Sequence, residues 1–193
     1  MGVYQICVSG SAKGNSVEQS RKQAVEIGDA LARAGHSLLT GATTGLPDFA
    51  AIGYKKAGGP SSVGLSPAST KVEHVLKYRL PTDEYDAILY TGLHYVGRDT
   101  MLITSADAVI SIGGRLVTLH EFTIAMEART PIAFLENSGG VGDKIKEIME
   151  LLPNADPELA MFDDDPERLV AKLTKYLDKL HEPYKHIYKP EKI

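Results

Sequence analysis

The sequence predicts an α/β protein with a doubly wound parallel sheet of about six or seven strands. Short apolar runs of strand length alternate with longer amphipathic runs along almost the whole chain, which is typical of βαβ units around a parallel sheet. Glycine follows four of the six apolar runs, where strands are expected to turn into helices. The chain has 193 residues, a length that fits one domain. We therefore expect a single Rossmann-like domain.

The six apolar runs have the length expected of strands that are buried on both faces. They are residues 3–8, 37–39, 62–65, 87–90, 108–112 and 132–135. The first helix is predicted to open on a capping box at residues 16–19 and to end at Gly35. Further helices are predicted at about residues 47–57, 98–105, 118–128, 143–151 and 166–180.

No linker or internal repeat divides the chain. Residues 67–86 are polar and include two prolines, so we predict a long connection at the middle of the sheet, where the strand order reverses. The Rossmann-like domain is expected to span residues 1–180. Residues 181–193 form a C-terminal tail without a periodic pattern, which is either disordered or packed on a partner subunit.

The composition excludes several classes of protein. Charged residues make up 24% and hydrophobic residues 43%, which does not fit disordered, collagen-like or coiled-coil chains. A formal charge of −4 provides no field that would hold a nucleic-acid backbone, so no nucleic acid is expected as a partner. No run of about 18 apolar residues is present, so no membrane association is expected.

The single cysteine, Cys7, lies in an apolar run and is predicted to be a small buried residue in a reducing compartment. The N-terminal residues lack the basic leader of a signal peptide, so we expect a cytoplasmic location. Known cofactor and metal motifs are missing: there is no Walker A loop, no GxGxxG fingerprint, no zinc-protease pair at His120 and no Schiff-base lysine context. We therefore expect neither a metal nor a cofactor.

The residues that follow the apolar runs indicate where a ligand binds, because ligands of open parallel sheets lie at the carboxyl ends of the strands. Glycine there lets backbone N–H groups approach a ligand, and the next helix offers its N-terminal donors to an anion. We expect a small phosphorylated ligand, although glycine at any single strand end also fits a plain tight turn. The candidates are Gly10, Ser11, Gly41, Gly45, Thr91, Gly92, Gly113 and Gly114.

Two charged side chains between residues 91 and 127 are candidate catalytic residues. Arg98 opens one predicted helix and Glu121 lies one turn into the next, each beside a strand end. In a cleft, arginine orients a phosphate or a sugar hydroxyl, and a carboxylate stabilises an oxocarbenium ion or activates water. The structural alternatives are a surface ion pair of Arg98 with Asp99 or Asp107 and a second capping box at residues 118–121.

Three nearby aromatic side chains are weaker candidates for the functional site. His120 fits a surface or packing role better than a catalytic one. His94 and Tyr95 lie in the predicted loop after the fourth strand and are candidates for the lining of the pocket.

A set of motifs between residues 6 and 126 is similar to one protein family. The matching positions are 6–8, 10–11, 41–46, 57–59, 63–67, 98, 106–108, 113–114 and 118–121. Arg98 and Glu121 stand 23 positions apart, as do the essential Arg and Glu of that family. The chain thus resembles the LOG-like proteins of the SLOG superfamily, often labelled lysine decarboxylase-like, which include the cytokinin riboside 5′-monophosphate phosphoribohydrolases.

The resemblance implies that a nucleoside 5′-monophosphate binds with its phosphate on the turn from Gly113 to Thr118. Residues 10, 11, 41 and 45 would surround the nucleotide. Arg98 and Glu121 would be the catalytic residues that flank the N-glycosidic bond, whose hydrolysis gives a free base and ribose 5-phosphate. The alternative is a non-catalytic protein that binds or senses a nucleotide or a cofactor, including one like the molybdenum cofactor. The resemblance also implies a homodimer, and it does not imply a genuine lysine decarboxylase.

The predicted phosphate turn departs from the PGGxGTxxE motif of the family. Gly113 replaces the proline, Arg115 replaces the second glycine and Val117 replaces the third. A β-branched residue resists the positive φ angles that glycine adopts, so we expect the turn to follow a different path. Arg115 either contacts the phosphate or fills the pocket, and nucleotide binding is better supported than hydrolysis.

Overall fold

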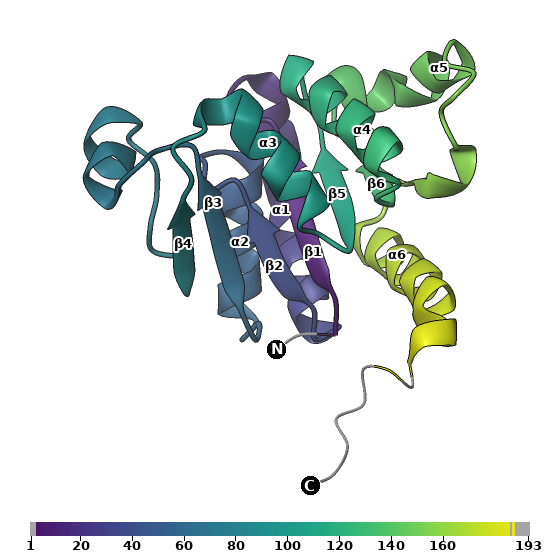
Figure 1. Cartoon of the computed structure of the whole chain (residues 1–193), viewed down its shortest axis with the longest axis horizontal. Coiled ribbons are helices and arrows are strands. Elements are labelled where there is room, and N and C mark those ends of the chain that lie inside the picture. The colour runs from purple at the N-terminus through teal and green to yellow at the C-terminus, as the bar shows by residue number, and fades with distance from the viewer. Residues whose placement is uncertain (1–2, 186, 188–193) are drawn as a thin grey trace, which may run out of the picture.

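A seven-stranded, all-parallel sheet forms the centre of the molecule (Figure 1). The computed structural model describes residues 3–185 and 187, and in that part of the chain the strand order is β4-β3-β2-β1-β5-β6-β7. The α/β doubly wound fold predicted from the sequence is therefore confirmed. The strands are β1 (Gln5–Gly10), β2 (Ser37–Thr40), β3 (Ser62–Ser66), β4 (Ala87–Tyr90), β5 (Ala108–Ile112), β6 (Ile132–Leu135) and β7 (Ala160–Asp163).

Helices cover both faces of the sheet, with α3 and α4 in front of it in Figure 1 and α1 and α2 behind it. The α-helices are α1 (Asn15–Arg33), α2 (Leu46–Lys56), α3 (His94–Thr104), α4 (Leu116–Ala128), α5 (Ile145–Glu150) and α6 (Pro166–His181). Short turns complete the chain: a π-helical turn η1 (Glu73–Lys77) and the 3-10 turns η2 (Gly140–Lys144), η3 (Pro157–Leu159) and η4 (Glu182–Tyr184). No described helix is long and apolar enough to cross a membrane.

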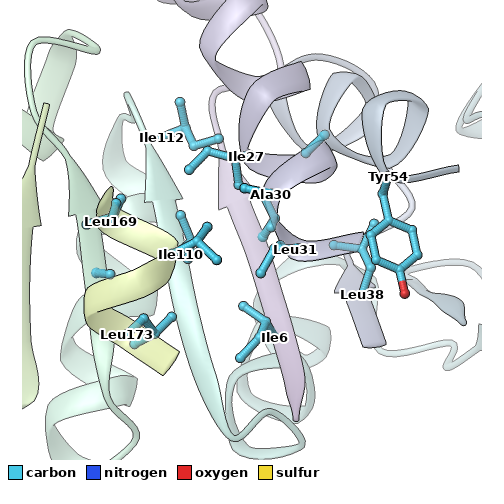
Figure 2. Packing of buried hydrophobic residues seen from close by; sticks show 14 of the residues in the cluster. Ile6, Ile27, Ala30, Leu31, Leu38, Tyr54, Ile110, Ile112, Leu169 and Leu173 are labelled. Carbon is cyan, nitrogen blue, oxygen red and sulfur yellow. The ribbon is translucent and has the colours of Figure 1, made fainter. Parts of the chain in front are cut away.

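The core under α1 and α6 is built from isoleucine and leucine side chains. Figure 2 shows Ile27 and Leu31 of α1 and Leu169 of α6 lying over Ile6 of β1 and Ile110 of β5, all of them fully or almost fully buried. A second core on the opposite face contains Cys7, Leu102, Phe122 and Phe134, so the predicted burial of Cys7 is confirmed. Burial on both faces explains why the central strands read as unbroken apolar runs.

The helices α1 and α2 approach each other backbone to backbone. A Cβ atom on Gly28 would lie 1.9 Å from the carbonyl oxygen of Ala50, and one on Gly53 would lie 2.2 Å from that of Val25. Only glycine permits this approach. It fixes α2, and with it the loop between β2 and α2, close to the end of β1.

The connection at residues 67–86 does not lie at the middle of the sheet, as predicted, but joins β3 to the edge strand β4. The strand order reverses later, where the chain passes from β4 through α3 to β5 beside β1. As an edge strand, β4 is partly exposed along its length, so the predicted burial on both faces is wrong for this strand. The seventh strand, β7, was not predicted as a separate run.

The first predicted capping box is wrong. Helix α1 begins at Asn15, its N-cap is Gly14 with φ +102°, and no side chain caps it. Ser16 Oγ instead donates a hydrogen bond of 2.8 Å to Ser11 Oγ in the preceding loop. The predicted stop near Gly35 holds, since α1 ends at Arg33.

Two further helix starts differ from the prediction. Helix α4 begins at Leu116 with Arg115 as its N-cap, so the second capping box, at residues 118–121, is wrong as well. Helix α3 begins at His94, which places His94 in a helix and not in a loop, and places Arg98 in the interior of α3 and not at its start. At the C-terminus, α6 extends to His181; residues 186 and 188–193 of the predicted tail lie outside the described residues, and the domain boundary at residue 180 stays a prediction.

Candidate functional site

A pocket of about 420 Å³ lies at the carboxyl ends of β1, β2 and β5, where the sequence predicted a ligand. The predicted residues that line it are Gly10, Ser11, Gly41, Arg98, Arg115, Thr118 and Glu121. These residues come from separate segments of the chain, and the parallel sheet brings them to one edge. Tyr95 in the first turn of α3 also lines the pocket.

Three predicted residues support neighbouring loops and are not among the lining residues. A Cβ on Gly45 would lie 2.4 Å from the carbonyl oxygen of Ser11, so glycine lets the loops after β1 and β2 touch. Thr91 Oγ1 donates a hydrogen bond of 2.7 Å to the carbonyl oxygen of Ser66. Gly92 has φ +68°, and a Cβ there would lie 3.0 Å from Ser69 Oγ.

The loop after β6 supports the turn between β5 and α4 through hydrogen bonds. The Gly113 N–H donates a hydrogen bond of 2.7 Å to Ser138 Oγ, which donates to the carbonyl oxygen of Leu135 at 2.5 Å. Gly113 and Gly114 both have positive φ, and a Cβ on Gly114 would lie 2.1 Å from Thr118 Oγ1. Neither glycine lines the pocket, but together they set the direction in which α4 begins.

The non-glycine residues of this turn fit their backbone without strain. Arg115 has φ −136°, and Val117 is already the second residue of α4, where φ is negative. Neither position therefore requires glycine. The substituted turn still presents the start of α4 to the pocket, and both Arg115 and Val117 line it.

The start of α4 is suited to an anion. The first N–H groups of a helix have no partner within it and carry a partial positive charge. The first turn of α4 holds no acidic residue. Three cationic side chains line the pocket without an ion-pair partner in the part of the chain that the structure describes, and these are Lys13, Arg79 and Arg115.

Glu121 is the one acidic side chain among the residues that line the pocket. Its side chain is buried, with 4% of the residue exposed, and Ser9 Oγ donates a hydrogen bond of 2.5 Å to Glu121 Oε2. Burial raises the pKa of Glu121 to about 7, with a smaller contribution from the nearby Asp99 carboxylate, while the Ser9 hydrogen bond and Arg98 oppose the shift. Near neutral pH the group is therefore divided between its neutral and charged forms.

Arg98 is buried against the strand ends and not against Glu121. Its Nη1 donates a hydrogen bond of 3.1 Å to the carbonyl oxygen of Leu65, and its Nε lies 3.2 Å from Asp99 Oδ1. A Cβ on Gly41 would lie 1.8 Å from Arg98 Nη1, so glycine at that strand end makes room for the guanidinium. The predicted alternative of an Arg98–Asp99 ion pair is found, but it is buried and not on the surface.

Asp99 connects Arg98 to a third side chain. His120 Nδ1 lies 3.5 Å from Asp99 Oδ2. Burial raises the pKa of Asp99, and Arg98 and His120 work against that shift. His120 is not among the residues that line the pocket, and the surface or packing role predicted for it stays a prediction.

Several lining residues were not among the predicted site residues. Tyr78, Arg79 and Leu80 come from the β3–β4 connection, where no glycine marked a strand end, and Ser9 directly precedes the predicted Gly10. The aromatic and basic pair Tyr78-Arg79 in an otherwise polar segment was the available signal. Among the described residues, no group of three or more His, Cys, Asp or Glu side chains is arranged to hold a metal ion.

Comparison with known proteins identifies a family model that matches most of this chain. A model of the SLOG cluster4 family matches residues 3–170. A protein from Archaeoglobus fulgidus, described as uncharacterized, is 30% identical over 136 residues, which cover 70% of this chain and 82% of that protein.

Solved structures share the fold along almost the whole chain. The X-ray structure of TM1055 superposes with a TM-score of 0.76 at 23% identity and covers 89% of this chain and 98% of its own. The Moco carrier protein from Chlamydomonas reinhardtii is 26% identical, with a TM-score of 0.75 and coverage of 91% of this chain and 98% of its own.

Proposed function

We propose, from the premise that the chain belongs to the SLOG cluster4 family, that its pocket binds and holds a small phosphorylated ligand without consuming it. A nucleoside 5′-monophosphate and a phosphorylated cofactor are the two kinds of ligand that fit this description. The observation that carries the proposal is the start of α4, which opens into the pocket beside Arg115 and has no acidic residue in its first turn.

The charge of the pocket supports an anionic ligand. The chain as a whole is acidic, with a formal charge of −4, yet Lys13, Arg79, Arg98 and Arg115 all line this pocket. The opposing carboxyl group, Glu121, is neutral in part of the molecules near pH 7 because its pKa is raised to about 7. A neutral Glu121 does not repel a phosphate.

The similarity to a carrier protein favours binding over turnover. The relative from Chlamydomonas reinhardtii is named a Moco carrier protein, and we extend to this chain only the class of role, the holding of a phosphorylated cofactor. Arg98 is consistent with holding, because its guanidinium is fixed by Leu65 and Asp99 and its position needs no rearrangement when a ligand enters.

Hydrolysis of an N-glycosidic bond is the second candidate function. Arg98 and Glu121 line the same pocket, and a carboxylate with a pKa of about 7 is suited to stabilise a cationic sugar or to activate water. This chemistry requires the charged form of Glu121. The rate of base release would therefore rise with pH through about 7.

One experiment separates the two functions. The purified protein is incubated with nucleoside 5′-monophosphates and with a phosphorylated pterin; thermal unfolding reports binding, and chromatography reports whether the ligand returns intact. We expect a higher melting temperature with intact ligand, and a smaller shift for Arg115→Gln. Free base that disappears with Glu121→Gln would establish hydrolysis instead, and the absence of both a thermal shift and free base would refute both functions.

We also propose that the chain forms a homodimer, as its resemblance to LOG-like proteins implies. Apolar side chains are exposed in the β3–β4 connection around η1, on the edge strand β4 and at the start of α3, and they support such an interface. They are Val72, Leu76, Leu89, Leu93 and Val96.

A further inference from the structure

Two tyrosines form one wall of the pocket, which we call the tyrosine wall. Tyr78 comes from the β3–β4 connection and Tyr95 from the first turn of α3, and both line the pocket. Their ring centroids are 5.7 Å apart at an interplanar angle of 79°, an edge-to-face arrangement that aromatic pairs favour. Tyr95 is 44% exposed, and the guanidinium carbon of Arg98 lies over its ring at 5.9 Å from the centroid.

The tyrosine wall and the start of α4 follow different strands at the carboxyl edge of the sheet. The wall follows β3 and β4, whereas α4 follows β5, and β2 and β1 lie between β3 and β5 in the sheet. Neighbouring strands are about 4.8 Å apart, so β3 and β5 are separated by roughly 14 Å. A ligand that spans the pocket from the start of α4 to the tyrosine wall must therefore contain a second chemical group besides its phosphate.

The wall is fixed in place before a ligand arrives. Tyr78 Oη is hydrogen-bonded to His94 Nδ1 at 2.7 Å, which ties the connection to α3. Behind it, the fully buried His74 is bonded through Nε2 to the carbonyl oxygen of Pro81 at 2.9 Å and through Nδ1 to Ser66 Oγ at 2.8 Å.

Both ring nitrogens of His74 have a hydrogen-bond partner. A carbonyl oxygen only accepts, so Nε2 donates to Pro81. Ser66 Oγ in turn accepts the N–H of Ala68 at 3.0 Å. The connection that carries Tyr78 is thus anchored to the end of β3, and little conformational entropy is lost there on binding.

Arg79 adds a cation beside the wall. Its φ of +54° lies in the left-handed region, and so does that of His94 at +55°. Non-glycine residues seldom adopt these angles, and they concentrate at ligand sites. Each of the two strained residues is adjacent in sequence to one tyrosine of the wall, and Arg79 lines the pocket without an ion-pair partner among the described residues.

We propose that the tyrosine wall stacks the planar heterocyclic ring of the ligand, a purine or a pterin, while its phosphate lies at the start of α4. This inference rests on the proposed function, because it assigns the other end of the same ligand. Aromatic side chains stack flat rings through their π-faces. Pro47 and Leu80 add apolar lining, which suits a ring and does not suit a sugar phosphate alone.

The absence of tryptophan from the sequence provides the test. In a Tyr78→Trp variant the introduced indole is the one tryptophan, and its fluorescence is followed while AMP, a phosphorylated pterin or ribose 5-phosphate is added. Calorimetry then compares AMP binding in wild type, Tyr95→Ala, Tyr95→Phe and Tyr184→Ala. Tyr184 is the control, because it is 52% exposed and lies in η4, outside the pocket.

We expect AMP and the pterin to quench the indole and ribose 5-phosphate to leave it unchanged. Loss of one stacking ring should weaken AMP binding in Tyr95→Ala by about tenfold, with no change in ribose 5-phosphate binding and no change in Tyr95→Phe or Tyr184→Ala. Quenching by one of the two ring compounds but not the other identifies the ring.

Two results overturn the inference, and they differ from each other. If AMP and ribose 5-phosphate bind equally well and Tyr95→Ala binds AMP like wild type, the wall does not stack a ring, although the phosphate site stands. If AMP, the pterin and ribose 5-phosphate all fail to bind the wild-type protein, the proposed function is wrong and the inference falls with it. Thermal melts of each variant confirm that the fold is kept.

Discussion

At the scale of single residues, Glu121 is the one acidic side chain among the residues that line the pocket. Ser9 comes from β1 and Glu121 from α4, 112 positions further along the chain, and the parallel sheet brings them within hydrogen-bonding distance. No spacing rule predicts such a pair, because it depends on which strands become neighbours. The residue type is nevertheless informative, because a glutamate one turn into a predicted helix beside a strand end is a candidate site residue from the sequence alone.

The raised pKa of Glu121 predicts how stability depends on pH. The group ionises near its ordinary value of 4.5 in the unfolded chain and near 7 in the folded one, so between these values the folded state binds more protons. The free energy of unfolding should therefore fall as pH rises from 4.5 to 7, by on the order of 3 kcal/mol. Urea unfolding of wild type and Glu121→Gln at pH 5 and pH 8 measures the difference.

The Glu121→Gln substitution keeps a hydrogen-bonding group beside Ser9 but removes the ionisable one, so the variant should lose this part of the pH dependence and be the more stable protein at pH 8. Equal pH dependence in the two proteins would show that Glu121 does not titrate near neutrality.

Gly41 makes room for Arg98, which leads to a second prediction. A Cβ there would lie 1.8 Å from Arg98 Nη1, so Gly41→Ala should displace the guanidinium from Leu65. We expect a loss of stability of about 1–3 kcal/mol from the overpacked, buried position, together with weaker binding of AMP in calorimetry. Gly58→Ala is the control, because its added Cβ meets no atom within 4 Å, although its φ of +77° adds some strain.

The comparison between the two alanine variants tests whether the close approach of Gly41 to Arg98 affects stability and binding. If Gly41→Ala and Gly58→Ala lose the same small amount of stability and bind AMP equally, the close approach of Gly41 to Arg98 has no functional consequence.

At the scale of elements, the start of α4 depends on the loop after β6. A Cβ on Gly140 would lie 2.1 Å from the carbonyl oxygen of Gly114, and the Val141 N–H donates to that same oxygen at 3.0 Å. The Ser138 hydroxyl bridges Gly113 and Leu135. The loop after β6 therefore shapes the turn that presents the α4 N–H groups, although it contributes no residue to the pocket lining.

A third prediction follows for Ser138→Ala. The substitution leaves the buried Gly113 N–H without its acceptor, which should cost about 1–3 kcal/mol of stability and weaken phosphate binding because the turn shifts. Chemical unfolding and calorimetry with ribose 5-phosphate measure the two effects. Ser105→Ala, at an exposed position after α3, should change neither, and a Ser138→Ala protein that binds like wild type would show that the turn does not need this support.

The elements that the sequence predicted well are those with strong periodic patterns. Strands β4, β5 and β6 have the predicted bounds, because continuous apolar runs of that length have few alternatives in an α/β chain. The starts of α1 and α4 were wrong, since serine and threonine near a glycine-rich turn were read as caps while the backbone of the turn itself sets where the helix begins. Strand β7 was missed because its four residues include a buried aspartate, Asp163.

At the scale of the whole molecule, the strand order places the site. The reversal between β1 and β5 leaves an opening at the carboxyl end of the sheet, as in other doubly wound sheets. The order of these central strands follows from the alternation of strands and helices, but the position of β4 at the edge does not. That is why the β3–β4 connection was assigned to the middle of the sheet and its tyrosine and arginine were missed.

The exposed apolar residues of the β4 edge and the start of α3 predict self-association. Light scattering should report a dimer for the wild-type chain, and Val96→Glu should shift the mass toward that of a monomer, because a charge cannot be buried cheaply in an apolar interface. Ile52→Glu, on the exposed side of α2, is the matched control and should leave the dimer intact. A monomeric wild-type protein would remove the expectation of a homodimer.

The most direct measurement is a crystal structure of the protein with a phosphorylated ligand that is retained through purification or added as AMP. We predict that the phosphate lies at the start of α4, within hydrogen-bonding distance of its first N–H groups and of Arg115, with Glu121 and Arg98 beside the sugar. A phosphate bound elsewhere, or an Arg115 side chain that fills the pocket and excludes the ligand, would contradict it.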